Sequence, residues 1–340
     1  MRAVVLVGGQ GTRLRPLTET LKKELLPLVD RPLLHHTMDR LVRHGVDHVV
    51  LSSSYLEASF GPFLEERNGS PVIEWITEPE PLDTGGAILN ALDRVGDEAF
   101  LAMNGDVITD LDLTELRSFH ERSSAAATIA LHRVEDARAF GLVSTASDGR
   151  VLEFREKPAE AVSGDINAGT YLLDRRAFEG FPAGEPLSIE TAVFPALIGS
   201  GRAVYGFRSD AYWMDLGTPE KYRRAQFDAL DGRMHGLRYE APYVGPGAHV
   251  DPTARLAPHA VIGAGVRVER DAEVAESVVL AGARIGAGAR VLDSILGPNA
   301  EVGEGASVLE SVVGESAQVG AGATIEDARV PPFTEARASD

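Results

Sequence analysis

The N-terminal two thirds of the chain alternates short apolar runs with longer amphipathic stretches. The short runs are rich in β-branched residues, as in buried strands, and the longer stretches have the apolar spacing of one helix face. The pattern predicts strands at 3–7, 46–52, 72–77, 99–103 and 126–131. It predicts helices at 33–44, 86–95, 113–122 and 219–230. Such an order is typical of an α/β layered domain with a largely parallel sheet.

A different period begins after a polar stretch at 231–242. Aliphatic residues recur every six positions from Val244 to Val274, and longer repeats of one constant length then start at 274, 291 and 308. Three short strands per repeat, each with an apolar residue facing inward, predict one coil of a three-sided parallel β-solenoid. The hexapeptide pattern resembles that of left-handed β-helices. We therefore expect a β-helix at 243–332 and a polar tail at 333–340.

Composition narrows the classes of function. The chain has 340 residues, 44% of them hydrophobic, which is enough apolar material for two domains. The net charge of −18 argues against nucleic acid or an anionic membrane as a partner. The absence of cysteine excludes disulfides, thiolate nucleophiles and cysteine-based zinc sites. No apolar run has the roughly 18 residues of a membrane span, so we expect a soluble, cytoplasmic protein.

A glycine-rich loop with its own cations follows the first apolar run. Residues 8–18 have the sequence GGQGTRLRPLT, in which the glycines permit positive φ and leave backbone N–H groups open to phosphate oxygens. Arg13 could bind two such oxygens with its planar guanidinium group. Six basic and three acidic residues lie within 2–31, so this segment has a net positive charge although the whole chain is negative. The alternative is an ordinary glycine-rich turn with a solvated arginine.

The loop and its extension to Lys23, Glu24 and Pro27 resemble the signature GGxGTRLxPLTxxxPKxxxP of the sugar-1-phosphate nucleotidylyltransferases. One position departs, because Lys22 stands where the family has proline. The resemblance implies that residues 1–230 are a Rossmann-like nucleotidyltransferase domain, with Arg13 and Lys23 as catalytic cations. It implies that the nucleotide is bound by the glycine-rich loop, namely by Gly8, Gly9, Gln10, Gly11 and Thr12.

Two distant aspartates resemble the metal ligands of this family. Asp106 lies in NGD after the strand at 99–103, and Asp215 lies in YWMDLGTPEKY, which is similar to the family segment WxDxGTPxxY. The resemblance implies that both bind Mg²⁺, whose preferred ligands are oxygens. Alone, NGD is also a common turn. Thr218 and Pro219 suit the N-cap and first position of the following helix.

The expected sugar side lies between residues 140 and 171. Glu156 and Lys157 belong to an EKP motif of the family, which implies that Lys157 holds the phosphate of the sugar and Glu156 its hydroxyls. Asn167 lies in DINAGTY, similar to the family strand xINAGxY that lines the sugar pocket. Gly141, after Phe140, is expected on the opposite wall of that pocket.

The segment 78–87 resembles EPLGTAGA, the base-side loop of the family. Gly85 and Gly86 are expected to allow close approach of the base, although Asp83 stands where glycine is usual. Glu78 occupies a position that is commonly glutamine in relatives that bind uracil or thymine. A carboxylate can accept from guanine N1–H and the N2 amine together, so Glu78 favours GTP. The alternative is a solvated glutamate in an acidic loop.

The implied reaction joins a sugar 1-phosphate to a nucleoside triphosphate and releases pyrophosphate. The pattern is closest to the branch of the family that uses GTP and mannose 1-phosphate. Open alternatives are another base, another sugar or a cyclitol phosphate, acyl transfer on the β-helix with His249 or His259 as base, and a catalytically silent homologue. We expect neither nucleic acid nor membrane as partner, and a homo-oligomer formed through the β-helix.

Overall fold

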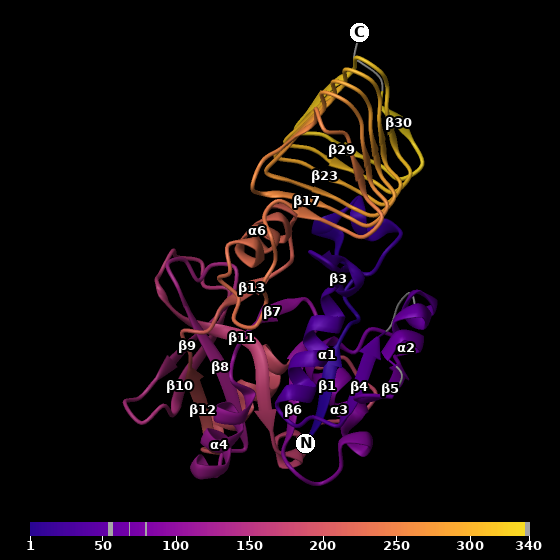
Figure 1. The fold of residues 1–340 in the computed structure, drawn as a ribbon. Coiled ribbons are helices and arrows are strands. Elements are labelled where there is room, and N and C mark those ends of the chain that lie inside the picture. Colours follow the sequence, from indigo (N-terminus) through magenta and orange to yellow (C-terminus); the bar gives the residue numbers. More distant parts are fainter. Residues whose placement is uncertain (54–56, 68, 79, 337–340) are drawn as a thin grey trace. The chain divides into compact units, whose positions relative to one another are not determined.

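The structure is a computed structural model that describes residues 1–53, 57–67, 69–78 and 80–336 (Figure 1). The chain divides into two compact units. The first comprises Met1–Gly9 and Leu34–Trp213. The second comprises Gln10–Leu33 and the chain from Met214 onward. The glycine-rich loop therefore begins in the first unit and continues in the second.

The first unit is built on a nine-stranded sheet with the order β10-β9-β11-β6-β1-β4-β5, in which β8 pairs with β11 and β12. The predicted strands are confirmed within a few residues at each end: β1 Arg2–Leu6, β4 His48–Ser53, β5 Val72–Thr77, β6 Phe100–Asn104 and β8 Ala127–Val134. The neighbours β6, β1, β4 and β5 are all parallel. Their carboxyl ends therefore meet at one edge of the sheet, where ligands of such sheets bind.

A mostly antiparallel part completes the sheet. The hydrophobic pattern did not predict its strands β9 Gly141–Thr145, β10 Val151–Glu156, β11 Gly164–Leu173 and β12 Val204–Arg208, and only β11 was expected as a strand, from the family resemblance. β12 pairs parallel with β8, and the short β7 Val107–Thr109 follows β6 outside this sheet. β11 pairs antiparallel with β6, β8 and β9. β10 is the edge strand and carries two exposed charged residues, Glu153 and Arg155, which is why its sequence does not resemble a buried strand.

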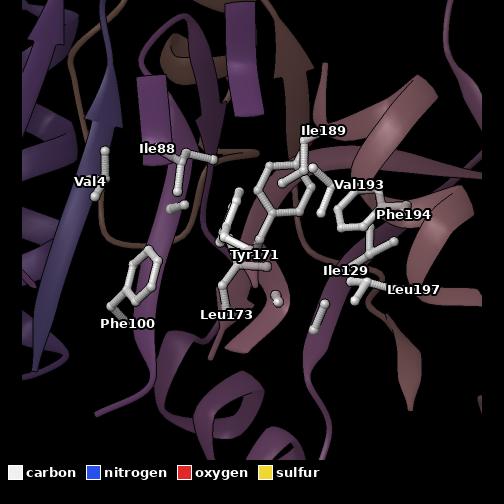
Figure 2. Close-up of a cluster of buried hydrophobic side chains, with 14 of the residues drawn as sticks. Val4, Ile88, Phe100, Ile129, Tyr171, Leu173, Ile189, Val193, Phe194 and Leu197 are labelled. Atoms are coloured by element: carbon white, nitrogen blue, oxygen red, sulfur yellow. The ribbon is translucent and has the colours of Figure 1, made fainter. Parts of the chain in front are cut away.

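Helices cover the sheet of the first unit: α1 Leu33–Arg43, α2 Gly61–Arg67, α3 Asp83–Val95, α4 Leu113–Ser123 and α5 Phe194–Gly199, the last directly after a π-helical turn at Ile189–Val193. Short 3₁₀ turns lie at Glu57–Phe60 and Arg175–Phe178. Figure 2 shows the buried cluster in which Ile88 of α3 and Phe194 of α5 pack with Val4, Phe100 and Tyr171 of the sheet. None of the helices in the described residues is long and apolar enough to cross a membrane.

The second unit begins with three 3₁₀ turns, η1 Thr12–Leu14, η2 Leu17–Glu19 and η3 Lys23–Leu25, and a hairpin of β2 Pro27–Leu28 and β3 Arg31–Pro32. The helix α6 Pro219–Leu230 follows β13 Trp213–Asp215. The side chains of Tyr222 and Gln226 donate to the Pro27 carbonyl at 2.6 and 2.8 Å, and Gln226 accepts from Val29 N at 2.6 Å. These buried hydrogen bonds hold residues 27–29 to a helix that lies far along the chain.

The rest of the second unit is a three-sided β-helix of parallel strands, visible as stacked rows in Figure 1. The first sheet has six strands: β14 Tyr243–Val244, β17 Ala260–Ile262, β20 Ser277–Val279, β23 Ile295–Leu296, β26 Val312–Val313 and β29 Arg329–Val330. The second also has six: β15 His249–Val250, β18 Arg267–Val268, β21 Arg284–Ile285, β24 Glu301–Val302, β27 Gln318–Val319 and β30 Glu335–Ala336. The third has five: β16 Arg255–Leu256, β19 Glu273–Ala275, β22 Arg290–Leu292, β25 Ser307–Leu309 and β28 Thr324–Glu326.

The register of the paired strands confirms the predicted change in the length of the solenoid repeat. Val244 pairs with Ile262, whereas Ile262 pairs with Val279, so the spacing between paired positions shortens by one along the solenoid. The shorter side turns through one residue at positive φ in each coil, namely Glu276, Asp293, Glu310 and Asp327. Serines stack beside this turn, since Ser294 Oγ accepts from Ser311 N at 3.0 Å and donates to Leu292 O at 2.6 Å.

Candidate active site

The glycine-rich loop is closed by its own polar groups. The positive φ falls on Gly11, at 62°, whereas Gly8 and Gly9 do not take it. Thr18 Oγ1 donates to Gly11 O at 2.8 Å, and a Cβ at Gly11 would lie 3.0 Å from the Thr18 methyl group. Thr12 begins the turn η1 and, like Gln10, is exposed. The loop thus closes on itself through Thr18, with Gln10 and Thr12 exposed.

Arg13 lies beside the turn that precedes α6. A Cβ on Gly217 would lie 2.6 Å from Arg13 Nη2 and 3.0 Å from Asp215 Oδ1, so this glycine leaves the space that the guanidinium group occupies. Lys221 Nζ lies 3.2 Å from Asp215 Oδ2. Thr218 caps α6 by accepting from Lys221 N at 3.4 Å, and Pro219 takes the first helical position, as predicted. The second unit thus brings Arg13 and Asp215 together.

The lysine pair of the signature is largely buried. Lys22, the departure from the family pattern, is 2% exposed, and the Lys23 side chain is 15% exposed. Lys23 Nζ lies 3.9 Å from the fully buried carboxylate of Glu24. The extra cation is therefore enclosed in the protein.

Three of the expected site residues of the first unit follow parallel strands at one edge. Gly8 comes after β1, Asp106 comes after β6, and Glu78 comes directly after β5. Gly105 N donates to Leu6 O at 2.9 Å, which fixes the turn of Asp106 to the end of β1. The prediction that Asp106 lies at the same edge of the sheet as the glycine-rich loop is confirmed.

Glu78 is buried, not a solvated loop residue. Its carboxylate is 5% exposed, accepts from Ser52 Oγ at 2.7 Å and accepts from Leu82 N at 3.1 Å. Each oxygen retains a second lone pair for a further donor. The burial and the two hydrogen bonds give this carboxylate a fixed orientation.

Gly85 and Gly86 lie against another segment of the chain. A Cβ on Gly85 would lie 2.8 Å from Leu187 O, and one on Gly86 would lie 2.7 Å from Glu185 O. These glycines thus permit the close approach of the backbone at 185–189, and their expected contact with the base stays a prediction. Asp83 has φ 59°, which explains why glycine is the usual residue at its position.

Gly141, Glu156 and Lys157 lie together at the sheet edge. Gly141 pairs with Glu156 in the β9–β10 ladder, and the next residue, Leu142, pairs with Ile166 of β11, so Gly141 lies next to the strand of Asn167 and not on a wall opposite to it. A Cβ on Gly141 would meet the Phe154 ring at 2.5 Å. Lys157 Nζ lies 2.9 Å from Glu156 Oε1, and Lys157 has the unusual φ of 43°. Residues in such sparsely populated backbone conformations cluster at functional sites.

Asn167 organises an irregularity in β11. Its Oδ1 accepts from Gly169 N at 3.0 Å and its Nδ2 donates to Tyr171 Oη at 2.8 Å, where the register with β8 shifts. Gly169 has φ 68°, and a Cβ there would lie 2.8 Å from the Asn104 amide nitrogen. The Asn167 amide therefore holds this bulge in place.

Glu190 is a candidate site residue that the sequence analysis missed. It accepts from Thr84 Oγ1 at 2.7 Å and from Ser188 Oγ at 3.1 Å. Burial raises the pKa of its carboxyl group, and the nearby charge of Glu156 raises it further. Its position in a π-helical turn could have been a signal, since such turns are frequent at functional sites.

The carboxylates fit the expected divalent ion in their chemistry. Mg²⁺ is held through one or two carboxylates plus substrate phosphates and waters, not by a cage of protein ligands. The described residues contain no group of three or more His, Cys, Asp or Glu side chains that could hold a metal. Asp215, with its side chain 18% exposed and Lys221 as counter-ion, supplies a carboxylate of the kind that such an ion prefers.

The two histidines considered for acyl transfer have different surroundings. His259 lies between two carboxylates, with Nε2 2.9 Å from Asp231 Oδ1 and Nδ1 3.0 Å from Glu276 Oε2. Its hydrogen bond to Asp231 raises the pKa of the imidazole, and Glu276 adds to this. Ionised carboxylates only accept hydrogen bonds, so this geometry favours a ring with both nitrogens protonated, and such a ring has no lone pair with which to accept a proton. His249 is exposed on β15.

Comparisons with known proteins cover nearly the whole chain. The family described as Nucleotidyl transferase matches residues 2–232, and the GMPPB C-terminal domain matches residues 239–339. A mannose-1-phosphate guanylyltransferase of Mycobacterium tuberculosis is 40% identical over 275 residues, 78% of this chain and 76% of the relative. A mannose-1-phosphate guanylyltransferase 1 of Arabidopsis thaliana is 34% identical over 288 residues, 82% of this chain and 79% of the relative.

A solved structure agrees with these relatives. HddC from Yersinia pseudotuberculosis, solved in complex with GMP-PN, superposes with a TM-score of 0.59 at 29% identity and covers 67% of this chain and 99% of HddC. The family match spans the glycine-rich loop, both aspartates and the EKP motif. On this basis the chain belongs to the nucleotidyl transferase family and is a nucleotidyltransferase.

Proposed function

We propose that the protein transfers a guanylyl group from GTP to mannose 1-phosphate and releases pyrophosphate. The observation that carries this choice is the 40% identity to a mannose-1-phosphate guanylyltransferase over about three quarters of both chains. The buried carboxylate of Glu78, held by Ser52 and Leu82, supports guanine, which offers two adjacent donors.

The proposed reaction is a direct displacement. An oxygen of the sugar phosphate attacks the α-phosphorus of GTP, the bond from that phosphorus to the bridging oxygen of the β-phosphate breaks, and pyrophosphate leaves. The sugar phosphate is already ionised near neutral pH, so no general base is needed. The protein then contributes positioning and charge stabilisation.

On the nucleotide side, we propose that Arg13 and Lys23 offset the charge that develops on the α-phosphate and the departing pyrophosphate. Asp106 and Asp215 are proposed as carboxylate ligands of Mg²⁺, which would neutralise phosphate charge when bound. Support for Arg13 comes from the space that Gly217 leaves for its guanidinium group.

On the sugar side, we propose that Lys157 holds the phosphate and that Glu156 and Glu190 accept hydrogen bonds from sugar hydroxyls. In the structure, Lys157 pairs with Glu156 at 2.9 Å. A phosphate would replace the carboxylate as partner of the lysine and release Glu156 for the hydroxyls. The hydrogen bonds of Asn167 to Gly169 and Tyr171 favour a role in shaping the pocket.

A screen of pyrophosphate release tests the proposal. GTP, ATP, UTP and dTTP are each combined with the 1-phosphates of mannose, glucose and other hexoses and with a cyclitol phosphate, in Mg²⁺ and in excess chelator. We expect the largest kcat/KM for GTP with mannose 1-phosphate and no turnover with chelator. Preference for another pair would contradict the substrate assignment.

Two substitutions test the site residues. Arg13→Ala should lower kcat by about 10²-fold, the scale of one preorganised electrostatic group. Arg15→Ala is the matched control, because Arg15 is also exposed in the same loop and stands at a variable position of the signature. Equal activity of both variants would contradict the role of Arg13.

Base recognition has its own pair of variants. Glu78→Gln should reduce the ratio of kcat/KM for GTP over dTTP by about 10-fold or more, because an amide nitrogen cannot accept a hydrogen bond. Glu80→Gln, in the same loop but exposed, is the control and should leave the ratio unchanged. An unchanged ratio in Glu78→Gln would remove the argument for guanine.

A further inference from the structure

The last coil of the β-helix contacts the glycine-rich loop through one side chain. Arg329 lies on β29 and donates from Nη1 to Arg15 O at 2.6 Å and to Arg13 O at 3.2 Å. Its Nη2 lies 4.0 Å from Glu220 Oε1 at the start of α6. A single guanidinium group thus joins the solenoid, the loop and α6, which lie far apart along the sequence.

The two carbonyl groups belong to a turn that needs an external donor. Arg13 and Arg15 lie in and directly after η1, where the last carbonyls of a helical turn have no partner within it. The next residue is Pro16, which has no N–H to offer. A cation at this end also suits the dipole of the turn. The guanidinium fork can serve both carbonyls at once.

A polar cavity lies beside this contact. Its volume is about 400 Å³, and it lies between the first turn of α6, with Glu220 and Arg223, and a face of the solenoid with Asp293, Glu310 and Asp327. Across it, Arg223 Nη2 lies 3.4 Å from Asp293 Oδ1. Long side chains thus connect the solenoid to the N-terminal end of α6, whereas the other end of α6 packs on the solenoid directly through the stacked rings of Phe227 and His259.

We infer that Arg329 is a positioning residue, through which the β-helix holds the backbone of Arg13 in the orientation that the nucleotidyl transfer requires. The inference rests on the proposed function of Arg13. It assigns to the C-terminal domain a direct role in ordering the glycine-rich loop. The side chain of Arg329 is half exposed, so its removal should affect the loop far more than overall stability.

The kinetic test uses the full chain with Arg329→Ala, Arg329→Lys and the control Arg284→Ala, which removes an exposed arginine from β21. In Arg329→Ala we expect kcat to fall about 10-fold, the scale of lost hydrogen bonds to a charged donor, with KM for mannose 1-phosphate unchanged. Arg329→Lys should recover part of the loss. Arg284→Ala should stay within about 2-fold of the parent protein, since it is remote from the loop.

Amide hydrogen exchange supplies a readout that needs no substrate. In Arg329→Ala the amides of Leu14 and Arg15, which donate to Gly11 O and Thr12 O, should exchange about 10-fold faster, and the amides of β21 should not. Unchanged exchange in the loop would overturn the inference, as would unchanged kcat with an unchanged melting temperature. If the parent protein released no pyrophosphate with any substrate pair, the proposed function would fail, while the exchange result would still decide whether Arg329 orders the loop.

Discussion

Gly217→Ala should remove most of the activity without unfolding the protein. The new Cβ would lie 2.6 Å from Arg13 Nη2 and 3.2 Å from its Cζ, where ordinary contact begins at 3.4 Å. The guanidinium group must therefore move by about 0.8 Å, since Gly217 precedes a capped helix that cannot easily shift. Gly217 has no positive φ, so alanine adds no backbone strain.

A misplacement of about 1 Å can cost about 10²-fold in rate, which corresponds to about 2.7 kcal/mol of activation free energy. Pyrophosphate release at saturating GTP and mannose 1-phosphate measures kcat, and thermal melting measures stability. Gly199→Ala is the matched control, because a Cβ there meets nothing within 4 Å. We expect an activity loss in Gly217→Ala alone, with both melting temperatures close to that of the parent protein.

The double variant with Arg13→Ala identifies the cause. If Gly217→Ala acts by displacing Arg13, it should cause almost no further loss of activity once the guanidinium group has been removed. Full additivity of the two losses would refute the reasoning and would point to Asp215, the other group near the new methyl. Retention of kcat within about 3-fold in the single variant would refute it as well.

Three further predictions concern the scaffold. Asp83→Ala should lower the free energy of unfolding by about 1 kcal/mol relative to Asp83→Gly in denaturant titrations, because φ at this position is 59°. Ser294→Ala should lower it by about 1–3 kcal/mol, because the Ser311 amide loses a buried acceptor; a smaller loss in Ser294→Ala than in an exposed-serine control would contradict this. The raised pKa of His259 implies stability that is complete below the ordinary value of 6.5 and decreases as pH rises through the folded-state pKa. Melting temperature should therefore fall above that pH in the parent protein and less in His259→Gln.

Local patterns were sufficient for most elements of the fold. The β-branched runs predicted β1, β4, β5, β6 and β8, because strands buried on both faces must be apolar along their length. The solenoid coil shortens by one residue along the chain, and the spacing of the apolar residues alone was enough to predict this. Each side of a coil contributes one inward-facing apolar residue, so the distance between successive ones gives the length of that side.

The edge strand β10 and the π-helical turn at Ile189–Val193 could not be predicted in this way. Their residues are charged or mixed, and they take their conformation from the neighbours with which they pair and pack. The same holds for Gly85 and Gly86, whose small size serves the backbone at 185–189.

The sequence by itself determined the family signature, the two domain types and the residue types that the chemistry requires. Only the tertiary structure decided how those residues are held: Gly217 leaves space for Arg13, Arg329 binds the carbonyls of the loop, and partial burial of Glu190 raises the pKa of its carboxyl group. These relationships join residues that lie far apart along the chain. No local period or propensity encodes them, because they depend on distances that exist only once the chain has folded.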